Sequence, residues 1–317
     1  MDNREHEAQG EPRHGHSLAE DLGAIGREMV ARRRALAFLA GTGAAAVLTA
    51  CGGDDSGSSS LGSETATSSS SSSTSTSGSS SSTSTSSSTS GGTLNASCIA
   101  DPTETNGPYP ADGTNSASGA TSNVLTQSGI VRPDIRSSFI GSTTTATGVP
   151  LELKLQLVDV TNGCAAISGA AIYVWHCDAY GRYSLYSSGV TAESYLRGVQ
   201  VTDAEGKVTF TTIYPACYSG RWPHVHFEIF TGGLTSASTG RTAALISQLA
   251  MPAATNIAVF TGDSTYTASI ANYNAISLSS DNVFGDNTSA QLAQMTPTLS
   301  GSVSAGYAGS ALIGIAT

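Results

Sequence analysis

The sequence is poor in charge. Only 12% of its 317 residues are Asp, Glu, Lys or Arg, whereas an ordinary soluble domain has about 25%. Cations are the scarcer sign, because 14 Lys and Arg face 24 Asp and Glu, for a formal net charge of −10. So few cations exclude the broad basic surface with which proteins bind nucleic acids or anionic membranes. We therefore expect no nucleic-acid partner.

A hydrophobic run long enough to span a bilayer is also lacking near the N-terminus. The apolar stretch at residues 35–50 is shorter than the ~20 residues of a membrane-spanning helix. It follows three consecutive arginines, residues 32–34, and ends at Leu48-Thr49-Ala50-Cys51. Basic residues, a short apolar run and small residues occur in this order in export signals. The paired arginines resemble a twin-arginine signal, and the last four residues resemble a bacterial lipobox with Cys51 as the lipidated residue.

These features predict three parts of the chain. Residues 1–50 are expected to be a signal segment that directs export and lipid anchoring to the bacterial cell envelope at Cys51. A signal anchor with a chance cysteine is the alternative. Residues 51–94 are mostly Ser, Thr and Gly and bury too little apolar surface to fold, so we predict a flexible tether. Residues 95–317 are then one folded domain.

This domain lacks long stretches of helical periodicity. Residues 151–160 instead alternate between apolar and polar side chains, as a half-buried strand does. Turn residues at 161–163 and 168–169 favour a hairpin between this strand and the next. Many short strands with Gly-rich connections predict an all-β fold, an antiparallel sandwich or an open barrel. The further strands are expected at residues 171–176, 199–202, 208–213, 224–230, 257–261 and 311–315.

Four cysteines fall in the domain: Cys98, Cys164, Cys177 and Cys217. An exported protein can keep disulfides. In the expected hairpin Cys164 lies at the turn, roughly 30 Å from Cys177, whereas a bridge needs Cα atoms within ~7 Å. Any disulfide therefore involves Cys98 or Cys217. The remaining pairings stay open, and free buried cysteines are the alternative.

Histidine is scarce, and only His176, His224 and His226 fall in the domain. On a strand, the two histidines of His224-Val225-His226 point to one face and could form half of a metal site. A solvent-exposed pair is the alternative. Such a site needs further ligands. Glu228 is the only nearby carboxylate, and tyrosine, with eleven residues in the chain, is the more abundant candidate.

Four separated blocks resemble, in order, the intradiol ring-cleavage dioxygenases, which include protocatechuate 3,4-dioxygenase and catechol 1,2-dioxygenase. The resemblance is greatest to the secreted single-domain members of this superfamily and covers about residues 98–317. It implies an all-β antiparallel sandwich of the intradiol type with long loops. The blocks are residues 98–109, 173–183, 196–206 and 214–227.

The resemblance implies a non-haem Fe(III) site with two tyrosine and two histidine ligands: Tyr183, Tyr218, His224 and His226. Tyr183 completes Asp-x-x-Gly-x-Tyr, and Tyr218 follows a Pro-x-x step. Phenolates are hard anionic donors that stabilise Fe(III), and a metal lowers the phenol pKa from its usual ~10. Tyr218 is also implied as the ligand that leaves the metal and acts as a base.

The resemblance also implies residues around the substrate. Arg221 is where the family has a substrate-orienting arginine, and its guanidinium can stabilise charge on a bound catecholate. A salt bridge to a loop carboxylate is the alternative for Arg221. Gln248 resembles a family glutamine near the substrate, and Gly107, Pro108 and Tyr109 resemble a wall of the active site. His176 is expected to point to the opposite face from Trp175 and to have no role.

The function implied is cleavage of a catechol-type aromatic diol by O2 between the two hydroxyl-bearing carbons. Two departures from the family put the substrate pocket in question: Cys217 beside Tyr218, and Ala250-Met251 after Gln248. One alternative is an exported binding module of the same fold that has lost turnover. Another is a copper- or zinc-binding lipoprotein that uses only His224 and His226.

Overall fold

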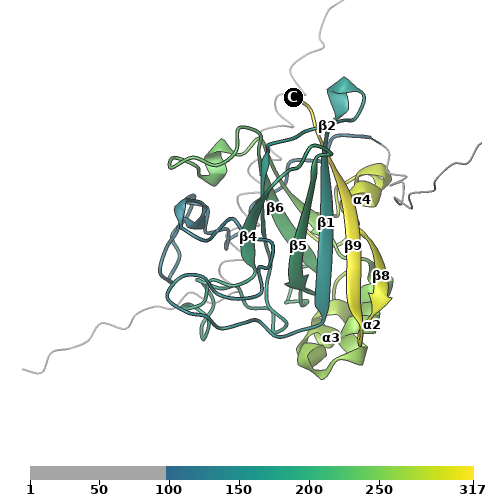
Figure 1. Ribbon diagram of the computed structural model, residues 1–317. Helices are drawn as coiled ribbons and strands as arrows, with labels where there is room; N and C mark the ends of the chain where they lie inside the picture. The colour runs from purple at the N-terminus through teal and green to yellow at the C-terminus, as the bar shows by residue number, and fades with distance from the viewer. Residues whose placement is uncertain (1–97) are drawn as a thin grey trace, which may run out of the picture. The chain divides into compact units, whose positions relative to one another are not determined.

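The structure is a computed structural model that describes residues 98–317 (Figure 1). The expected signal segment, the tether and the lipidation site at Cys51 lie outside the described residues. Within residues 98–317, no helix has the length and apolarity to cross a membrane.

Two sheets stack face to face (Figure 1), which confirms the all-β sandwich. The first sheet has the order β2-β1-β9-β8, and β5 also pairs with β1; the second has the order β4-β3-β6-β7. Neighbouring strands run antiparallel, except that β1 and β9 are parallel. The strands are β1 (Pro150–Asp159), β2 (Ala165–Ala166), β3 (Ala171–Trp175), β4 (Arg197–Val201), β5 (Lys207–Ile213), β6 (His224–Phe230), β7 (Leu245–Ala250), β8 (Thr298–Ser302) and β9 (Gly306–Ile315).

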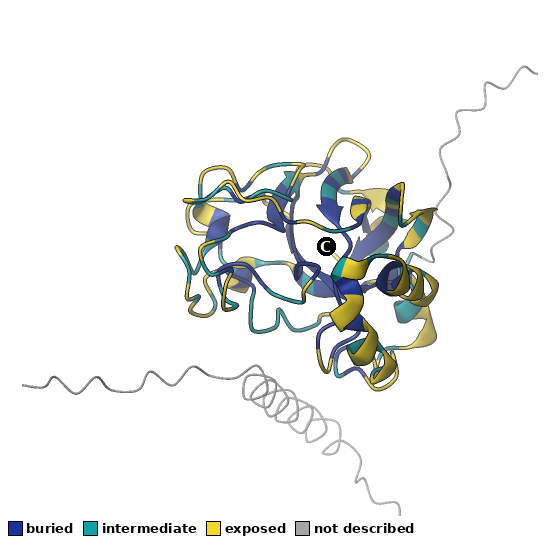
Figure 2. Ribbon diagram, turned by 90° about the horizontal axis from the view of Figure 1, so that it is seen from below, coloured by how far each residue is buried: buried dark blue, intermediate teal, exposed yellow. Residues whose placement is uncertain are grey.

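The two sheets differ in how they are buried. Strand β1 alternates as its sequence predicts: Leu151, Leu153 and Leu155 are buried, whereas Glu152 and Lys154 face outwards. All residues of β3 and β6 are buried; Figure 2 shows buried segments in the interior of the domain and exposed ones mainly in the surrounding loops and helices. The second sheet therefore has a protected interior on both of its faces.

The helices lie at the edges of the sandwich. They are α2 (Ala253–Gly262), α3 (Thr267–Asn274) and α4 (Ser289–Met295), with short 3₁₀ turns η1 (Val124–Thr126), η2 (Val160–Asn162), η3 (Gly240–Thr242) and η4 (Ser264–Tyr266). Helix α2 contradicts the strand expected at residues 257–261. Pro252 at its N-cap and the buried residues Asn256, Val259 and Phe260 fit one face of a helix. The β-branched and aromatic run was therefore a misleading strand signal.

The expected hairpin between residues 151–160 and 171–176 is also wrong. Strand β1 instead pairs with β2, β5 and β9, and β3 belongs to the other sheet. The turn residues form η2 and the short β2, which folds back on the end of β1 before the chain crosses over.

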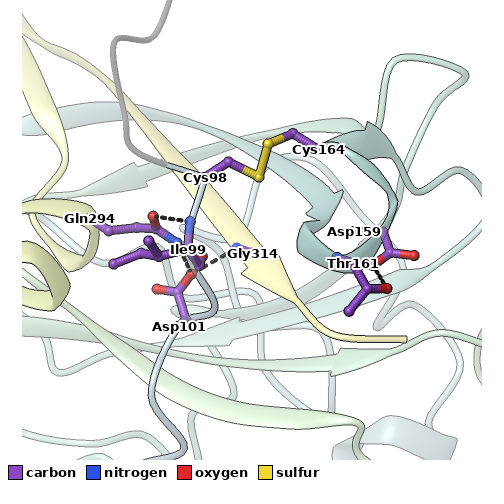
Figure 3. The surroundings of a disulfide bond; sticks show 8 residues. All are labelled: Cys98, Ile99, Asp101, Asp159, Thr161, Cys164, Gln294 and Gly314. Atoms are coloured by element: carbon purple, nitrogen blue, oxygen red, sulfur yellow. Dashed lines mark hydrogen bonds between the residues drawn. A yellow bond between two sulfur atoms is a disulfide. The ribbon is translucent and has the colours of Figure 1, made fainter.

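One disulfide closes the N-terminal end of the domain. Cys98 is bonded to Cys164, with their Cα atoms 6.0 Å apart, while Cys177 and Cys217 are free and buried (Figure 3). The expectation that Cys98 or Cys217 takes part is thus confirmed, although the hairpin used to reach it is not. Beside the disulfide, the buried carboxylate of Asp101 accepts hydrogen bonds from the Gln294 side chain and the Gly314 backbone.

Candidate metal centre

Strand β6 positions two histidines on the outer face of the second sheet. His224 and His226 are each only 2% exposed, so they are not a solvent-exposed pair. Their Nε2 atoms lie 3.1 Å apart. The adjacent β3 supplies Trp175, whose ring stacks on His226 with centroids 4.7 Å apart and planes 6° apart. This stack fixes the plane of the His226 imidazole.

Two tyrosine hydroxyls complete a cluster of four polar atoms. The Tyr183 hydroxyl lies 3.3 Å from each histidine Nε2 and 3.4 Å from the Tyr218 hydroxyl. The Tyr218 hydroxyl lies 3.2 Å from Nε2 of His224. The structure therefore brings together all four side chains that the sequence predicts as ligands, although they come from three separate segments.

The spacing of these four atoms fits a metal ion. Five of their six separations lie between 3.1 and 3.4 Å. A regular tetrahedron with such edges has its centre about 2 Å from each corner, close to metal–nitrogen and metal–oxygen distances in proteins. Among residues 98–317, no group of three or more His, Cys, Asp or Glu could hold a metal. A metal at this point thus depends on the tyrosines.

The electrostatics of the histidines suit ligation. Burial lowers the pKa of His224 to about 3 and that of His226 well below its usual value, so both rings are neutral near pH 7. Nδ1 of His224 lies 2.5 Å from the Trp222 carbonyl, which can only accept, so Nδ1 carries the proton. The lone pair of His224 Nε2 then faces the cluster.

The tyrosines are in the opposite situation. Burial raises the pKa of both Tyr183 and Tyr218, so neither phenolate forms readily in this apolar site on its own. A trivalent cation would reverse this preference, because it compensates two buried negative charges. The donor set of two neutral imidazoles and two phenols therefore fits Fe(III).

Two glycines let the backbone approach the cluster. Gly107 has a φ of +71°, and a Cβ there would lie 3.2 Å from Cε1 of His226. Gly181, in the Asp-x-x-Gly-x-Tyr motif, has a φ of +81°, and its Cβ would lie 3.1 Å from Cβ of Tyr218. Any side chain at either position would be strained and would crowd a predicted ligand.

The segment around Gly107, predicted to form a wall of the active site, lies beside the cluster. The Tyr109 ring lies 4.9 Å from the ring of Tyr183. Pro108 lies between Gly107 and Tyr109, and its carbonyl accepts a hydrogen bond from the Asn115 side chain. Gly107 and Tyr109 thus contact different predicted ligands from the same loop.

Arg221 and Gln248 are joined directly. The Arg221 guanidinium donates to Oε1 of Gln248 at 2.7 Å, and Nε2 of Gln248 donates to the carbonyl of Thr105 at 2.9 Å. Gln248 therefore links Arg221 to the loop that carries Gly107.

Asp281 is a site residue that the sequence did not single out. It forms a buried ion pair with Arg221 at 3.0 Å. It also accepts hydrogen bonds from the backbone N–H groups of Trp222, Val283 and Phe284. Although burial opposes it, Arg221 and these backbone groups lower the Asp281 pKa. The loop carboxylate considered as an alternative partner for Arg221 thus exists, and it fixes the guanidinium beside the cluster.

The third histidine of the domain and the nearby carboxylate, His176 and Glu228, make contacts outside the cluster. His176 hydrogen-bonds Thr212 of the first sheet through Nε2 at 2.7 Å, so it faces away from Trp175 as predicted. Glu228 is fully buried, and burial next to Asp112 raises its pKa far above the usual range. Neither side chain belongs to the cluster of four donors.

A cavity of about 540 Å³ opens beside the cluster. Two of the predicted ligands, Tyr183 and Tyr218, form part of its wall, so a small molecule inside it would lie beside the tyrosine side of the cluster. Its lining residues are Tyr109, Tyr180, Gly181, Arg182, Tyr183, Tyr186, Ser187, Ser188, Tyr218, Ser219 and Asn272.

Comparisons with known proteins match part of the sequence to a family and the domain to solved structures. A family model described as "Dioxygenase" matches residues 136–258, a range that contains all four predicted ligands. An intradiol ring-cleavage dioxygenase from Tetranychus urticae matches with a TM-score of 0.51 and 24% identity, over 69% of this chain and 95% of that one. The match to the dioxygenase domain of a dioxygenase–carbohydrate-binding protein fusion from Streptomyces sp. SirexAA-E has a TM-score of 0.40 and 20% identity, over 69% of this chain and 99% of that one.

No curated protein matches the sequence. The family match is confined to residues 136–258, and the structural match shows a shared sandwich fold. Residues 136–258 thus match the dioxygenase family, and the domain shares its sandwich fold with an intradiol ring-cleavage dioxygenase.

Proposed function

We propose that this domain is a non-haem Fe(III) dioxygenase that opens the ring of a catechol-type aromatic diol between its two hydroxyl-bearing carbons. The observation that carries the proposal is the convergence of two phenol oxygens and two imidazole nitrogens, with five of their six separations between 3.1 and 3.4 Å. Bound Fe(III) would supply a Lewis acid that activates the catecholate towards O2.

Atoms and electrons balance in this reaction. Catechol and one O2 give one muconate-type diacid, and both oxygen atoms enter the product. The carbon–carbon bond between the hydroxyl-bearing carbons breaks, and the organic substrate loses the four electrons that O2 gains. No further reductant is needed, which agrees with a site built from ligands and positioning residues alone.

The residues around the donors have separable tasks. Tyr218 is 8% exposed and lines the cavity, so its phenolate is placed to take a proton from an incoming catechol hydroxyl. Arg221, held by Asp281 and Gln248, provides a fixed positive charge for a substrate that becomes anionic. Tyr109 lines the same cavity as Tyr218, and Gly107 lies against the ring of His226.

Export and lipid anchoring at Cys51 complete the proposal. The lipobox-like sequence and the Ser-rich segment after it support a domain attached to the cell envelope, where it meets aromatic diols outside the cytoplasm. Metabolic labelling with a fatty-acid analogue tests this part. We expect the label to be incorporated into the protein and lost in Cys51→Ser.

Oxygen uptake by the purified protein with a panel of catechols tests the activity. We expect about one iron per chain, a red-brown tyrosinate-to-Fe(III) colour, and one O2 consumed per diol. Coloured protein that consumes no O2 with any catechol would indicate the inactive binding module instead. Colourless protein with stoichiometric copper or zinc would overturn the iron site.

A further inference from the structure

The cavity beside the predicted metal centre is larger than the ring that the reaction needs. Its volume of about 540 Å³ falls among cavities that take drug-sized ligands, roughly 300–1,000 Å³. Catechol has only eight non-hydrogen atoms. If its two oxygens approach the donors at Tyr183 and Tyr218, most of the cavity beyond the ring stays available for a substituent.

Aromatic rings line this outer space. The Tyr109 ring lies 4.9 Å from Tyr183 and 5.3 Å from Tyr186, so three rings continue outwards from a predicted ligand. At the mouth, Tyr180 is 56% exposed. An exposed ring of this size at a cavity mouth offers a face on which a second aromatic ring can stack.

The residues that line the cavity include no charged side chain that lacks an ion-pair partner. Arg182 is the one charged side chain among them, and its guanidinium is engaged by Asp178 at 2.7 Å. It also stacks over the Tyr180 ring, 4.8 Å from its centroid. The remaining polar groups are hydroxyls and the Asn272 amide. A carboxylate on the substrate would therefore lose hydration without gaining an unpaired cation.

We propose that the site takes catechols that carry an uncharged aryl substituent, in preference both to catechol itself and to catechols with a ring carboxylate. This rests on the proposed function, because it assumes that the diol end binds at the four donors. The substituent then lies along Tyr109 and Tyr186 and stacks at the mouth against Tyr180. Tyr180 is the specificity-determining residue of this arrangement.

Anaerobic titration calorimetry of the iron-loaded protein tests the preference without turnover. The probes are catechol, 4-phenylcatechol and 3,4-dihydroxybenzoate. We expect the dissociation constant of 4-phenylcatechol to be about tenfold below that of catechol, because a buried and stacked ring is added. We expect 3,4-dihydroxybenzoate to bind most weakly. Equal affinities for the first two, or tightest binding of the carboxylate, would overturn the inference.

Variants at the mouth of the cavity test whether Tyr180 causes the preference for the aryl substituent. Tyr180→Ala should weaken 4-phenylcatechol about fivefold and leave catechol unchanged, while Tyr180→Phe should retain the preference, since it keeps the ring. Val131→Ala is the control, because Val131 is equally exposed at 56% but lies outside the cavity lining. If Tyr180→Ala weakens both diols equally, the ring does not set specificity.

The two proposals fail in different ways. If the protein binds the three probes in the expected order but consumes no O2 with any of them, the dioxygenase proposal fails and the preference for aryl substituents stands. If it turns over all three diols with similar kcat/KM and similar affinity, the activity stands and the preference fails. If none of the three diols binds, both proposals fail.

Discussion

The two sheets of the sandwich have different roles: the first contributes mainly to stability, and the second carries the candidate site. In the first sheet, β1 alternates between buried and exposed side chains over residues 150–155, and Glu152 and Lys154 lie on its solvated outer face. In the second sheet, β3 and β6 are buried on both faces, and their outer face carries the histidine pair and Trp175. Stability and chemistry should therefore respond to substitutions in different sheets.

The largest expected effect comes from removing a donor in the second sheet. His226→Ala should abolish stoichiometric iron binding and lower oxygen uptake by about 10³-fold or more, because only three of the four donors remain. Iron content and visible absorbance measure the first effect. His176→Ala is the matched control, since that buried histidine bonds Thr212 of the first sheet. It should lower Tm and keep the colour; loss of iron in both variants would contradict the division.

The next effect belongs to the first sheet and should change stability alone. The disulfide between Cys98 and Cys164 closes a loop with a sequence separation of 66, for which chain entropy predicts about 4 kcal/mol of stabilisation. The double variant Cys98→Ser with Cys164→Ser should lose about this much in urea unfolding and keep its kcat at 25 °C. A reductant should destabilise the wild type and leave the variant unaffected. Loss of kcat in the folded variant would couple the two sheets.

Asp101 should make the stability of the first sheet depend on pH. Burial raises its pKa from 3.8 to about 6, so the folded state holds a proton that the unfolded state releases. The stabilisation is complete below pH 3.8 and is lost as the pH rises through 6, a cost of about 3 kcal/mol at neutral pH. Urea unfolding between pH 4 and 7 should show this decline in the wild type relative to Asp101→Asn.

Asp159 is the control for this measurement, because its pKa is shifted in the opposite direction to that of Asp101. Hydrogen bonds from Thr317 and Thr161 lower its pKa to about 2, so its contribution is present above pH 3.8 and constant between pH 4 and 7. Asp159→Asn should therefore shift the whole stability curve without changing its slope. A slope unchanged in Asp101→Asn would show that another group causes the decline.

The smallest expected effect sharpens the role of the buried ion pair in the second sheet. Asp281→Asn keeps the shape of the side chain but removes the charge that holds Arg221. We expect kcat/KM for the diol to fall about 10- to 100-fold, roughly 1.4–2.7 kcal/mol, with iron content unchanged. Asp134→Asn, which breaks an exposed pair with Arg136, should change neither quantity. If Asp281→Asn loses iron, the residue supports the metal centre rather than the substrate.

The same division explains what the sequence could predict. The alternation at residues 151–160 gave the location of β1, because that strand has one face in water. The motif positions of Tyr183, Tyr218, His224 and His226 led to a cluster whose donor atoms meet. Arg221 and Gln248 followed from the same blocks and are hydrogen-bonded to each other. Short segments with fixed spacing thus carried most of the candidate site.

What failed depends on long-range pairing. The turn residues after β1 signalled a reversal but not its partner, and the chain crossed to the other sheet. Asp281 is 60 residues from Arg221, and no local spacing marks it as the partner. The run at residues 257–261 satisfied a strand pattern, yet Pro252 and the packing of Val259 and Phe260 favour α2. Tertiary contacts decided each of these cases.

The stack of Trp175 on His226 has an optical consequence. The chain has only two tryptophans, and both adjoin the four donors: Trp175 contacts His226, and the carbonyl of Trp222 bonds His224. A tyrosinate–iron chromophore this close would accept their excitation energy. The tryptophan fluorescence of the protein therefore reports on a single place in it, and this emission should fall as iron is loaded. The second sheet thus contains its own probe of occupancy, without any added label.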